Sequence, residues 1–115
     1  MMKKYYSGRK YRNIKCEYNG IKFDSIKERN YYIYLDQMQK EGQIYDLQLQ
    51  VKFELQPAFK TAEGKKIRSI TYTADFTYFT PDGKWHIIDT KGVKTDVYNL
   101  KKKMMLFQGY VIEEV

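Results

Sequence analysis

The sequence has little of what metal-thiolate, disulfide-bonded and membrane proteins need: one cysteine, one histidine, two prolines and no long hydrophobic run. The single Cys16 excludes an internal disulfide, and one histidine, His86, is too few for a zinc site of cysteines and histidines. Every apolar segment falls short of the roughly 18 residues that span a membrane, and the N-terminus lacks the apolar core of a signal peptide. We therefore expect a cytoplasmic protein without a membrane partner.

What is present indicates a folded protein. Of the 115 residues, 43% are hydrophobic and 17% are aromatic, more than a disordered chain carries. A chain of this length buries one modest core and is too short for two. We expect a single domain over residues 14–115, preceded by a basic arm over residues 1–13.

Positive charge is concentrated at the N-terminus. The formal net charge is +7, and residues 1–22 hold seven lysines or arginines against one acid, Glu17. Tyrosines lie between these cations, a mixture that suits phosphates and stacking on bases. A solvated, poorly ordered terminus is the alternative. The cations expected to contact nucleic acid here are Lys3, Lys4, Arg9, Lys10, Arg12 and Lys15.

The segment after the arm predicts a hairpin followed by a helix. Asn19-Gly20 lies between short alternating stretches, which predicts a two-residue turn because both turn positions need positive φ. The next segment carries Asp24 or Ser25 as an N-cap, no proline, and Gly42 just past its end. Those signals predict a helix between the cap and the glycine.

Three alternating segments predict strands. Residues 45–56 alternate apolar and polar side chains without interruption until Pro57, which predicts a strand with one wet face. A turn around Gly64 leads into a second alternating segment, residues 68–80, and the turn "PDG" leads into a third, residues 84–91. We expect these strands to pair mainly antiparallel.

A second helix and a last strand complete the predicted fold. Thr95 or Asp96 caps the helix, Gly109 ends it, and residues 110–115 follow as a strand. Strands joined through a helix in this way are usually parallel. The apolar stripe of the helix comprises Val97, Leu100, Met104 and Phe107. The result is an α/β fold in which two helices flank a mixed sheet.

The third strand ends on "IIDTK", where Asp89 and Lys91 are two residues apart and share one face of the strand. If "PDG" is a three-residue loop, Thr80 pairs with Lys84, and the same register places Asp75 opposite Asp89. Opposed carboxylates destabilise a sheet unless something positive lies between them. We therefore expect a hard divalent cation, Mg²⁺ or Mn²⁺, at this pair.

Glu28 is a third candidate acid, because it lies on the buried stripe of the first helix. The alternative is a capping box, in which Glu28 accepts a hydrogen bond from the Ser25 amide. Lys91 also has two interpretations. It forms a structural salt bridge with Asp89, or it orients or deprotonates an attacking water and stabilises the transition state. His86 alternates to the opposite face and is expected to be a packed side chain.

With Glu28, Asp75, Asp89 and Lys91 in this order, the chain resembles the PD-(D/E)XK nuclease superfamily. That family carries a Glu on its first helix, an Asp on its second strand and (D/E)-x-K on its third, and "YTADF" and "IIDTKG" match the two strands. Ala74 stands where proline is common, and aspartate replaces the more frequent glutamate at position 89, which would bring a metal nearer the backbone. The stretches "FDSIKE", "YTADF" and "DTKGVKTDVY" also resemble small phage-encoded proteins without an assigned activity, over roughly Arg9 to the C-terminus.

The resemblance implies a restriction-endonuclease-like α-β-β-β-α-β core and metal-dependent hydrolysis of DNA phosphodiester bonds, with Lys91 as the catalytic lysine. The metal ligands that it implies are Glu28, Asp75, Asp89 and the Thr90 carbonyl. Compact members resemble Holliday junction resolvases, which act as homodimers, so branched DNA in phage recombination within a bacterial cell is the expected substrate and setting. A nucleic-acid-binding module without cleavage is the alternative. Further phosphate contacts are expected from Lys94, Lys101, Lys102 and Lys103.

Overall fold

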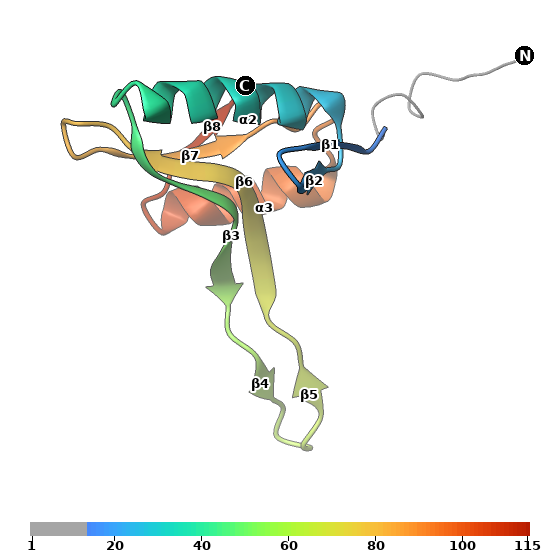
Figure 1. Cartoon of the computed structure of the whole chain (residues 1–115). Coiled ribbons are helices and arrows are strands. Elements are labelled where there is room, and N and C mark those ends of the chain that lie inside the picture. Colours follow the sequence, from blue (N-terminus) through green and yellow to red (C-terminus); the bar gives the residue numbers. More distant parts are fainter. Residues whose placement is uncertain (1–13) are drawn as a thin grey trace, which may run out of the picture. The chain divides into compact units, whose positions relative to one another are not determined.

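The computed structural model describes residues 14–115, a mixed α/β protein with a mixed sheet of four strands and two helices (Figure 1). The chain divides into two compact units, of which the first ends at Gln43 and the second covers Ile44–Val115. Within residues 14–115, no helix combines the length and the apolar character that crossing a membrane requires. The cations outside the described residues are Lys3, Lys4, Arg9, Lys10 and Arg12.

The first unit begins with a hairpin. Its strands β1 (Cys16–Tyr18) and β2 (Ile21–Phe23) pair antiparallel. The turn residues Asn19 and Gly20 have φ angles of 53° and 78°. Both values are positive, as a two-residue turn that follows the twist of its strands requires. The predicted hairpin is therefore confirmed.

The helix α2 (Ile26–Lys40) follows the hairpin in the first unit. The Ser25 hydroxyl accepts a hydrogen bond of 3.0 Å from the Glu28 amide, which satisfies one of the unpaired donors at the start of the helix. Gly42 lies just past the end with a φ of 77°, a conformation that glycine adopts without strain. The predicted helix, its cap and its end are confirmed.

The second unit contains the sheet and the second helix. Its elements in chain order are β3 (Tyr45–Gln56), β4 (Phe59–Lys60), β5 (Lys66–Ile67), β6 (Ile70–Phe79), β7 (Trp85–Asp89), α3 (Asp96–Phe107) and β8 (Ile112–Glu114). The four-stranded sheet has the order β3-β6-β7-β8, and all its neighbours are antiparallel except β7 and β8. The parallel pairing of β7 with β8 on either side of α3 confirms the predicted connection. β4 and β5 form a separate two-stranded ribbon.

The loop between β6 and β7 has the predicted three-residue form. The Thr80 amide donates to the Lys84 carbonyl at 3.1 Å, and the Gly83 amide donates to the Thr80 carbonyl at 2.8 Å. Gly83 has a φ of 85°, the left-handed conformation that this loop needs at its last position. This loop fixes the register between the two strands that carry the candidate acids.

β3 is less regular than its sequence alternation predicted. Its pairing with β6 shifts register near Asp46 and again beside Leu55, between Glu54 and Gln56. Asp46 and Gln50 have φ angles of 56° and 53°, left-handed values that are uncommon for residues other than glycine. Irregularities of this kind bend a strand and increase its twist. The uninterrupted strand that alternation predicted is therefore wrong in this respect, although its bounds are confirmed.

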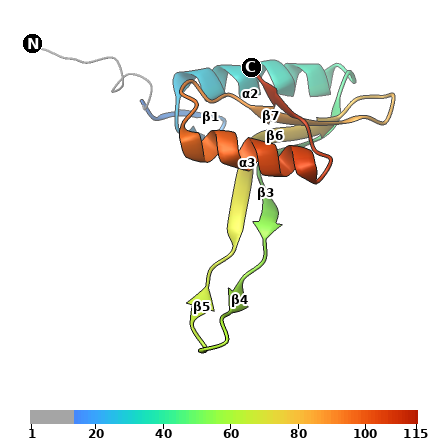
Figure 2. The ribbon, with the colours of Figure 1, turned by 180° about the vertical axis from the view of Figure 1, so that it is seen from behind.

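The helix α3 packs on the sheet of the second unit (Figure 2) through a different face from the one predicted. Tyr98 and Met105 are buried, at 4% and 0% exposure, whereas Phe107 is 92% exposed. Val97 and Leu100 are exposed as well, whereas Met104 packs against the core, so the predicted burial of the stripe is wrong except at Met104. The buried core of the unit comprises Phe53, Leu55, Tyr72, Ala74, Ile87, Tyr98, Met105 and Ile112. Burying the large Tyr98 ring while its hydroxyl bonds Glu114 favours the observed face.

Candidate active site

The register of β6 and β7 brings two acids together in the second unit. The last paired residues of the two strands are Phe76 and Ile88. Asp75 and Asp89 come one residue beyond this last pair, so their direct opposition, which the sequence predicted, stays a prediction. Asp89 is only 2% exposed and Asp75 is half-buried. Two acids therefore adjoin the last paired residues of β6 and β7, Asp75 within β6 and Asp89 at the end of β7.

The Asp75 carboxylate is held from one side. Its Oδ2 accepts two hydrogen bonds of 2.8 Å from Thr90, one from the backbone amide and one from the hydroxyl. Within the described part of the chain, Oδ1 of Asp75 accepts no hydrogen bond. Each carboxylate oxygen has two lone pairs, so Oδ1 remains available to a further ligand.

The Asp89 carboxylate is fixed by two donors. Its Oδ2 accepts a hydrogen bond of 2.6 Å from the Tyr72 hydroxyl, and its Oδ1 accepts one of 2.7 Å from the Lys91 amide. A buried carboxylate needs such donors, because leaving it unpaired in an apolar core is costly. The salt bridge between Asp89 and the Lys91 ammonium, one of the two interpretations of Lys91, is wrong: the backbone of Lys91 makes the contact.

The Lys91 ammonium is held beside an aromatic ring. Its Nζ lies 5.0 Å from the centroid of the Tyr98 ring, within the range of a cation-π interaction. The Lys91 side chain is otherwise exposed, and within residues 14–115 it makes no salt bridge. An exposed ammonium two residues after Asp89 can reach a bound anion.

A third carboxylate, Glu114 of β8, lies beside the same ring. The Tyr98 hydroxyl donates to Oε2 of Glu114 at 2.7 Å. Two lysines of the expected phosphate-binding set also contact it: the ammonium of Lys102 lies 3.0 Å from Oε2, and that of Lys94 lies 3.9 Å from Oε1. These two lysines are therefore paired with an acid near Lys91.

Electrostatics join these groups into one cluster. Burial raises the pKa of the Tyr72 phenol, and the hydrogen bond to Asp89 raises it further. Burial likewise raises the pKa of Tyr98, followed by its bond to Glu114 and the charge of Asp89. The charge of Asp75 acts on both phenols. The hydrogen bond from Tyr98 lowers the pKa of Glu114. Both tyrosines therefore stay neutral donors at neutral pH, inside a region of negative potential.

Glu28 lies in the first unit. It is 5% exposed, and its Oε1 accepts a hydrogen bond of 3.1 Å from the Asp24 amide while its own amide donates to Ser25. This arrangement is that of a capping box, except that the carboxylate binds the amide one residue before Ser25. The capping alternative is supported, with Asp24 rather than Ser25 as the donor.

The donor set of the second unit fits a hard divalent cation. Within residues 14–115, no three aspartate, glutamate, histidine or cysteine side chains gather into a metal-binding group. Mg²⁺ needs fewer protein ligands, since it keeps several waters and binds through one or two carboxylates and the phosphates of its substrate. Asp75 and Asp89 supply two carboxylates, and Oδ1 of Asp75 is open.

The remaining predicted cations and His86 lie elsewhere. Lys15 pairs with Asp24 at 3.5 Å on the surface. Lys101 is half-buried and Lys103 is exposed on α3. His86 bonds Thr80 and Glu113 and stacks on Tyr78, which agrees with its predicted packing role.

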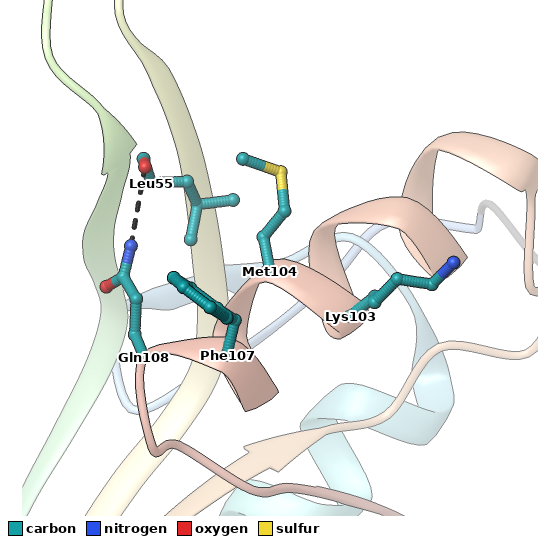
Figure 3. A pocket seen from close by; sticks show the side chains of 5 residues that line it. All are labelled: Leu55, Lys103, Met104, Phe107 and Gln108. Atoms are coloured by element: carbon teal, nitrogen blue, oxygen red, sulfur yellow. Dashed lines mark hydrogen bonds between the residues drawn. The ribbon is translucent and has the colours of Figure 1, made fainter.

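A cavity in the second unit is separate from the candidate acids. Figure 3 shows it at the C-terminal end of α3, where the side-chain amide of Gln108 donates to the backbone carbonyl of Leu55 at 3.3 Å. Its volume is about 440 Å³. The lining residues are Leu55, Lys103, Met104, Phe107 and Gln108. None of them belongs to the acidic cluster.

Sequence reasoning missed Tyr72, Tyr98 and Glu114. Alternation only groups Tyr72 with the apolar side chains on one side of its strand, and Tyr98 lies outside the predicted apolar stripe of its helix. The available signal was chemical: a buried tyrosine hydroxyl needs a hydrogen-bond partner, and acids near the ends of neighbouring strands are candidates.

Comparison with known proteins identifies the family. No curated protein and no solved structure matches the chain at a significant level. A family model with the description "Protein of unknown function (DUF1064)" matches residues 8–113, nearly the whole sequence. The chain therefore belongs to the DUF1064 family.

Proposed function

We propose that the protein is a Mg²⁺- or Mn²⁺-dependent endonuclease that hydrolyses phosphodiester bonds in DNA. The observation that carries the proposal is the register of β6 and β7, which ends at Phe76 and Ile88 and leaves Asp75 and Asp89 each one residue beyond that pair, with Lys91 two residues after Asp89. The order α2, β3, β6, β7, α3, β8 also supports a restriction-endonuclease-like core. Branched DNA in phage recombination, inside a bacterial cell, is the substrate and setting included in the proposal.

Three groups of the second unit would hold the metal ion: the carboxylates of Asp75 and Asp89 and the carbonyl of Thr90. When bound, such an ion supplies Lewis-acid stabilisation of the phosphate charge and lowers the pKa of coordinated water. The chain itself fixes the two carboxylates, through Thr90 on Asp75 and through the Tyr72 hydroxyl on Asp89. Preorganised ligands avoid the cost of ordering them when the substrate arrives.

Lys91 is the proposed catalytic lysine. Its ammonium can donate to the attacking water or to a phosphate oxygen, because the side chain is exposed and its carboxylate neighbour is bound through the backbone instead. The Tyr98 ring attracts the ammonium by roughly 0.5–1 kcal/mol and limits its positions. In the reaction the water oxygen gives up a proton and forms the new bond to phosphorus, while the bond from phosphorus to the leaving sugar oxygen breaks and that oxygen takes a proton.

Glu28 completes the proposal as a third ligand, in competition with its capping role. Glu28→Gln separates the two roles, because the amide oxygen of glutamine can still accept the hydrogen bond from Asp24 while the charge is lost. Loss of cleavage with an unchanged melting temperature assigns Glu28 to the metal. Unchanged cleavage assigns it to the cap alone.

The test of the proposal is nicking of supercoiled plasmid and cleavage of a four-way junction in Mg²⁺. Lys91→Ala should abolish cleavage while the protein remains folded, because the side chain is exposed and makes no salt bridge within residues 14–115. Asp89→Asn should abolish it as well. Lys84→Ala, on another exposed lysine, is the matched control and should cut like the wild type. Equal cutting by all four proteins contradicts the assignment.

A second candidate function is nucleic-acid binding without cleavage. The observation that favours it is that both oxygens of Asp89 already accept protein hydrogen bonds and that Glu28 caps its helix. Calorimetry with Mn²⁺ separates the two candidates. A nuclease should take up the ion with an affinity that Asp75→Asn weakens, whereas a binding module should show no uptake that depends on Asp75.

A homodimer is part of the proposal, with the outer face of α3 as its surface. Val97, Leu100 and Phe107 are exposed there. Asp96 and Lys103 are two helical turns apart on one flank of this apolar face, so an antiparallel second copy brings opposite charges together at both ends. Light scattering should give twice the mass of the chain, and Phe107→Glu should give the mass of one chain. A wild-type monomer contradicts this part.

A further inference from the structure

The ribbon formed by β4 and β5 projects from the sheet of the second unit (Figures 1 and 2). β7 pairs only with residues 76–79 of β6. The part of the sheet that leads to the ribbon therefore consists of two strands, β3 and β6. From Gln56 to the turn at Ala62 the ribbon extends about 20 Å, at roughly 3.3 Å for each residue of a strand. A two-stranded ribbon gains little stability by itself in water.

The ribbon is basic. Residues 57–68 hold four cations, all exposed, against one exposed acid, Glu63. The cations are Lys60, Lys65, Lys66 and Arg68. None of them forms a salt bridge within residues 14–115. Three of the cations come from the short run at residues 65–68, and Lys60 on the opposite strand adds the fourth.

Two of these cations oppose each other. Lys60 pairs directly with Lys66 across the ribbon, and Arg68 follows two residues after Lys66. Side chains at directly opposed positions are about 4.5–5.5 Å apart at Cβ, and like charges there destabilise the pairing. A polyanion between the two ammonium groups removes that repulsion. The ribbon therefore becomes more stable when phosphates occupy its charged face.

We propose that the β4-β5 ribbon inserts into the major groove of double-stranded DNA, with Lys60, Lys66 and Arg68 on backbone phosphates. This inference rests on the proposed function for its choice of a nucleic acid as partner. The major groove of B-form DNA is about 12 Å wide and admits a two-stranded ribbon, whereas the deep, narrow major groove of A-form RNA does not. The ribbon therefore selects duplex DNA over duplex RNA.

The experiment measures binding by fluorescence anisotropy of a labelled duplex, with Ca²⁺ in place of Mg²⁺, over a range of salt concentrations. The ribbon variant is Lys60→Gln with Lys66→Gln and Arg68→Gln. The slope of the logarithm of the binding constant against the logarithm of the salt concentration should fall in magnitude by about 2 to 3. The affinity should fall by about 10- to 100-fold, because three phosphate contacts are lost. The matched control neutralises three exposed lysines outside the ribbon, at positions 22, 27 and 84, and should lose less than about threefold.

A second variant, Lys60→Arg with Lys66→Arg, keeps the charge and should bind like the wild type. Loss of binding in this variant, or wild-type affinity and slope in the triple glutamine variant, overturns the inference. Tighter binding of the wild type to duplex RNA than to duplex DNA overturns it as well.

The same proteins separate this inference from the endonuclease proposal. A wild type that binds through the ribbon and never cuts in Mg²⁺ refutes the nuclease and supports the ribbon. A wild type that cuts, together with a triple variant that binds and cuts equally well, refutes the ribbon and leaves the nuclease. No binding of the wild type to duplex DNA refutes both.

Discussion

Replacing Tyr72 by phenylalanine removes one hydroxyl from the centre of the candidate site. That hydroxyl donates a hydrogen bond of 2.6 Å to the carboxylate of Asp89, a residue that is only 2% exposed. Hydrogen bonds to charged groups contribute roughly 1.5–3 kcal/mol, so the free energy of unfolding near neutral pH should fall by about that amount. Urea titration of the two proteins followed by circular dichroism measures the difference.

The same substitution has a predictable dependence on pH. The pKa of Tyr72 is raised in the folded protein, above the value of 10.0 that it has when unfolded. Its contribution is therefore fully present below pH 10 and is lost as the pH rises above it, because only the unfolded chain releases the proton. Near pH 11 the unfolded wild type gains about 1.4 kcal/mol from this ionisation. The stability difference between wild type and variant should shrink by about that amount.

Tyr34→Phe provides the matched control, because Tyr34 is 54% exposed. It should change the free energy of unfolding by less than about 0.5 kcal/mol. A cost below that limit for Tyr72→Phe near neutral pH would refute the reasoning. So would a difference between wild type and variant that stays constant from neutral to strongly alkaline pH.

Four further substitutions test other parts of the structure. Met105→Ala should cost about 2–5 kcal/mol in urea titration because the side chain is fully buried, whereas Phe107→Ala, at a position exposed in the single chain, should cost less than about 0.5 kcal/mol at protein concentrations too low for the proposed dimer. A larger cost for Phe107→Ala than for Met105→Ala would show that the predicted stripe is the buried face of the helix. Ser25→Ala removes the N-cap and should cost about 0.5–2 kcal/mol in the same titration. Glu114→Gln should flatten the acid loss of stability seen in thermal melts. The lowered pKa of Glu114 stabilises the fold above its unfolded value of 4.5, and this contribution disappears as the pH falls through the folded value.

Local signals were sufficient where a turn or a cap sets the geometry. Asn19-Gly20 and Gly83 require positive φ, and Ser25 offers the oxygen that a helix start needs. The three-residue loop ending at Gly83 then fixed the register that pairs Phe76 with Ile88, the neighbours of the two candidate acids. The sequence could therefore place both candidate acids beside the same pair of residues.

Local signals were insufficient where tertiary packing decides which side chains are buried. Hydrophobic periodicity chose Val97 for the buried face of α3, yet Tyr98 is buried because its ring fills the core and its hydroxyl reaches Glu114. Periodicity counts apolar side chains and gives no weight to a polar tip that finds a partner. The partners of Lys91 also come from distant segments, the Tyr98 ring among them, so no local pattern could place its ammonium.

The most direct test of the account is the position of a bound metal ion. A crystal of the protein soaked in Mn²⁺ should show an anomalous peak at bonding distance, about 2.0–2.2 Å, from carboxylate oxygens of both Asp75 and Asp89. Asp75→Asn crystals soaked in the same way should lack it. A peak at other residues only, or none at a saturating concentration, would contradict the proposed active site.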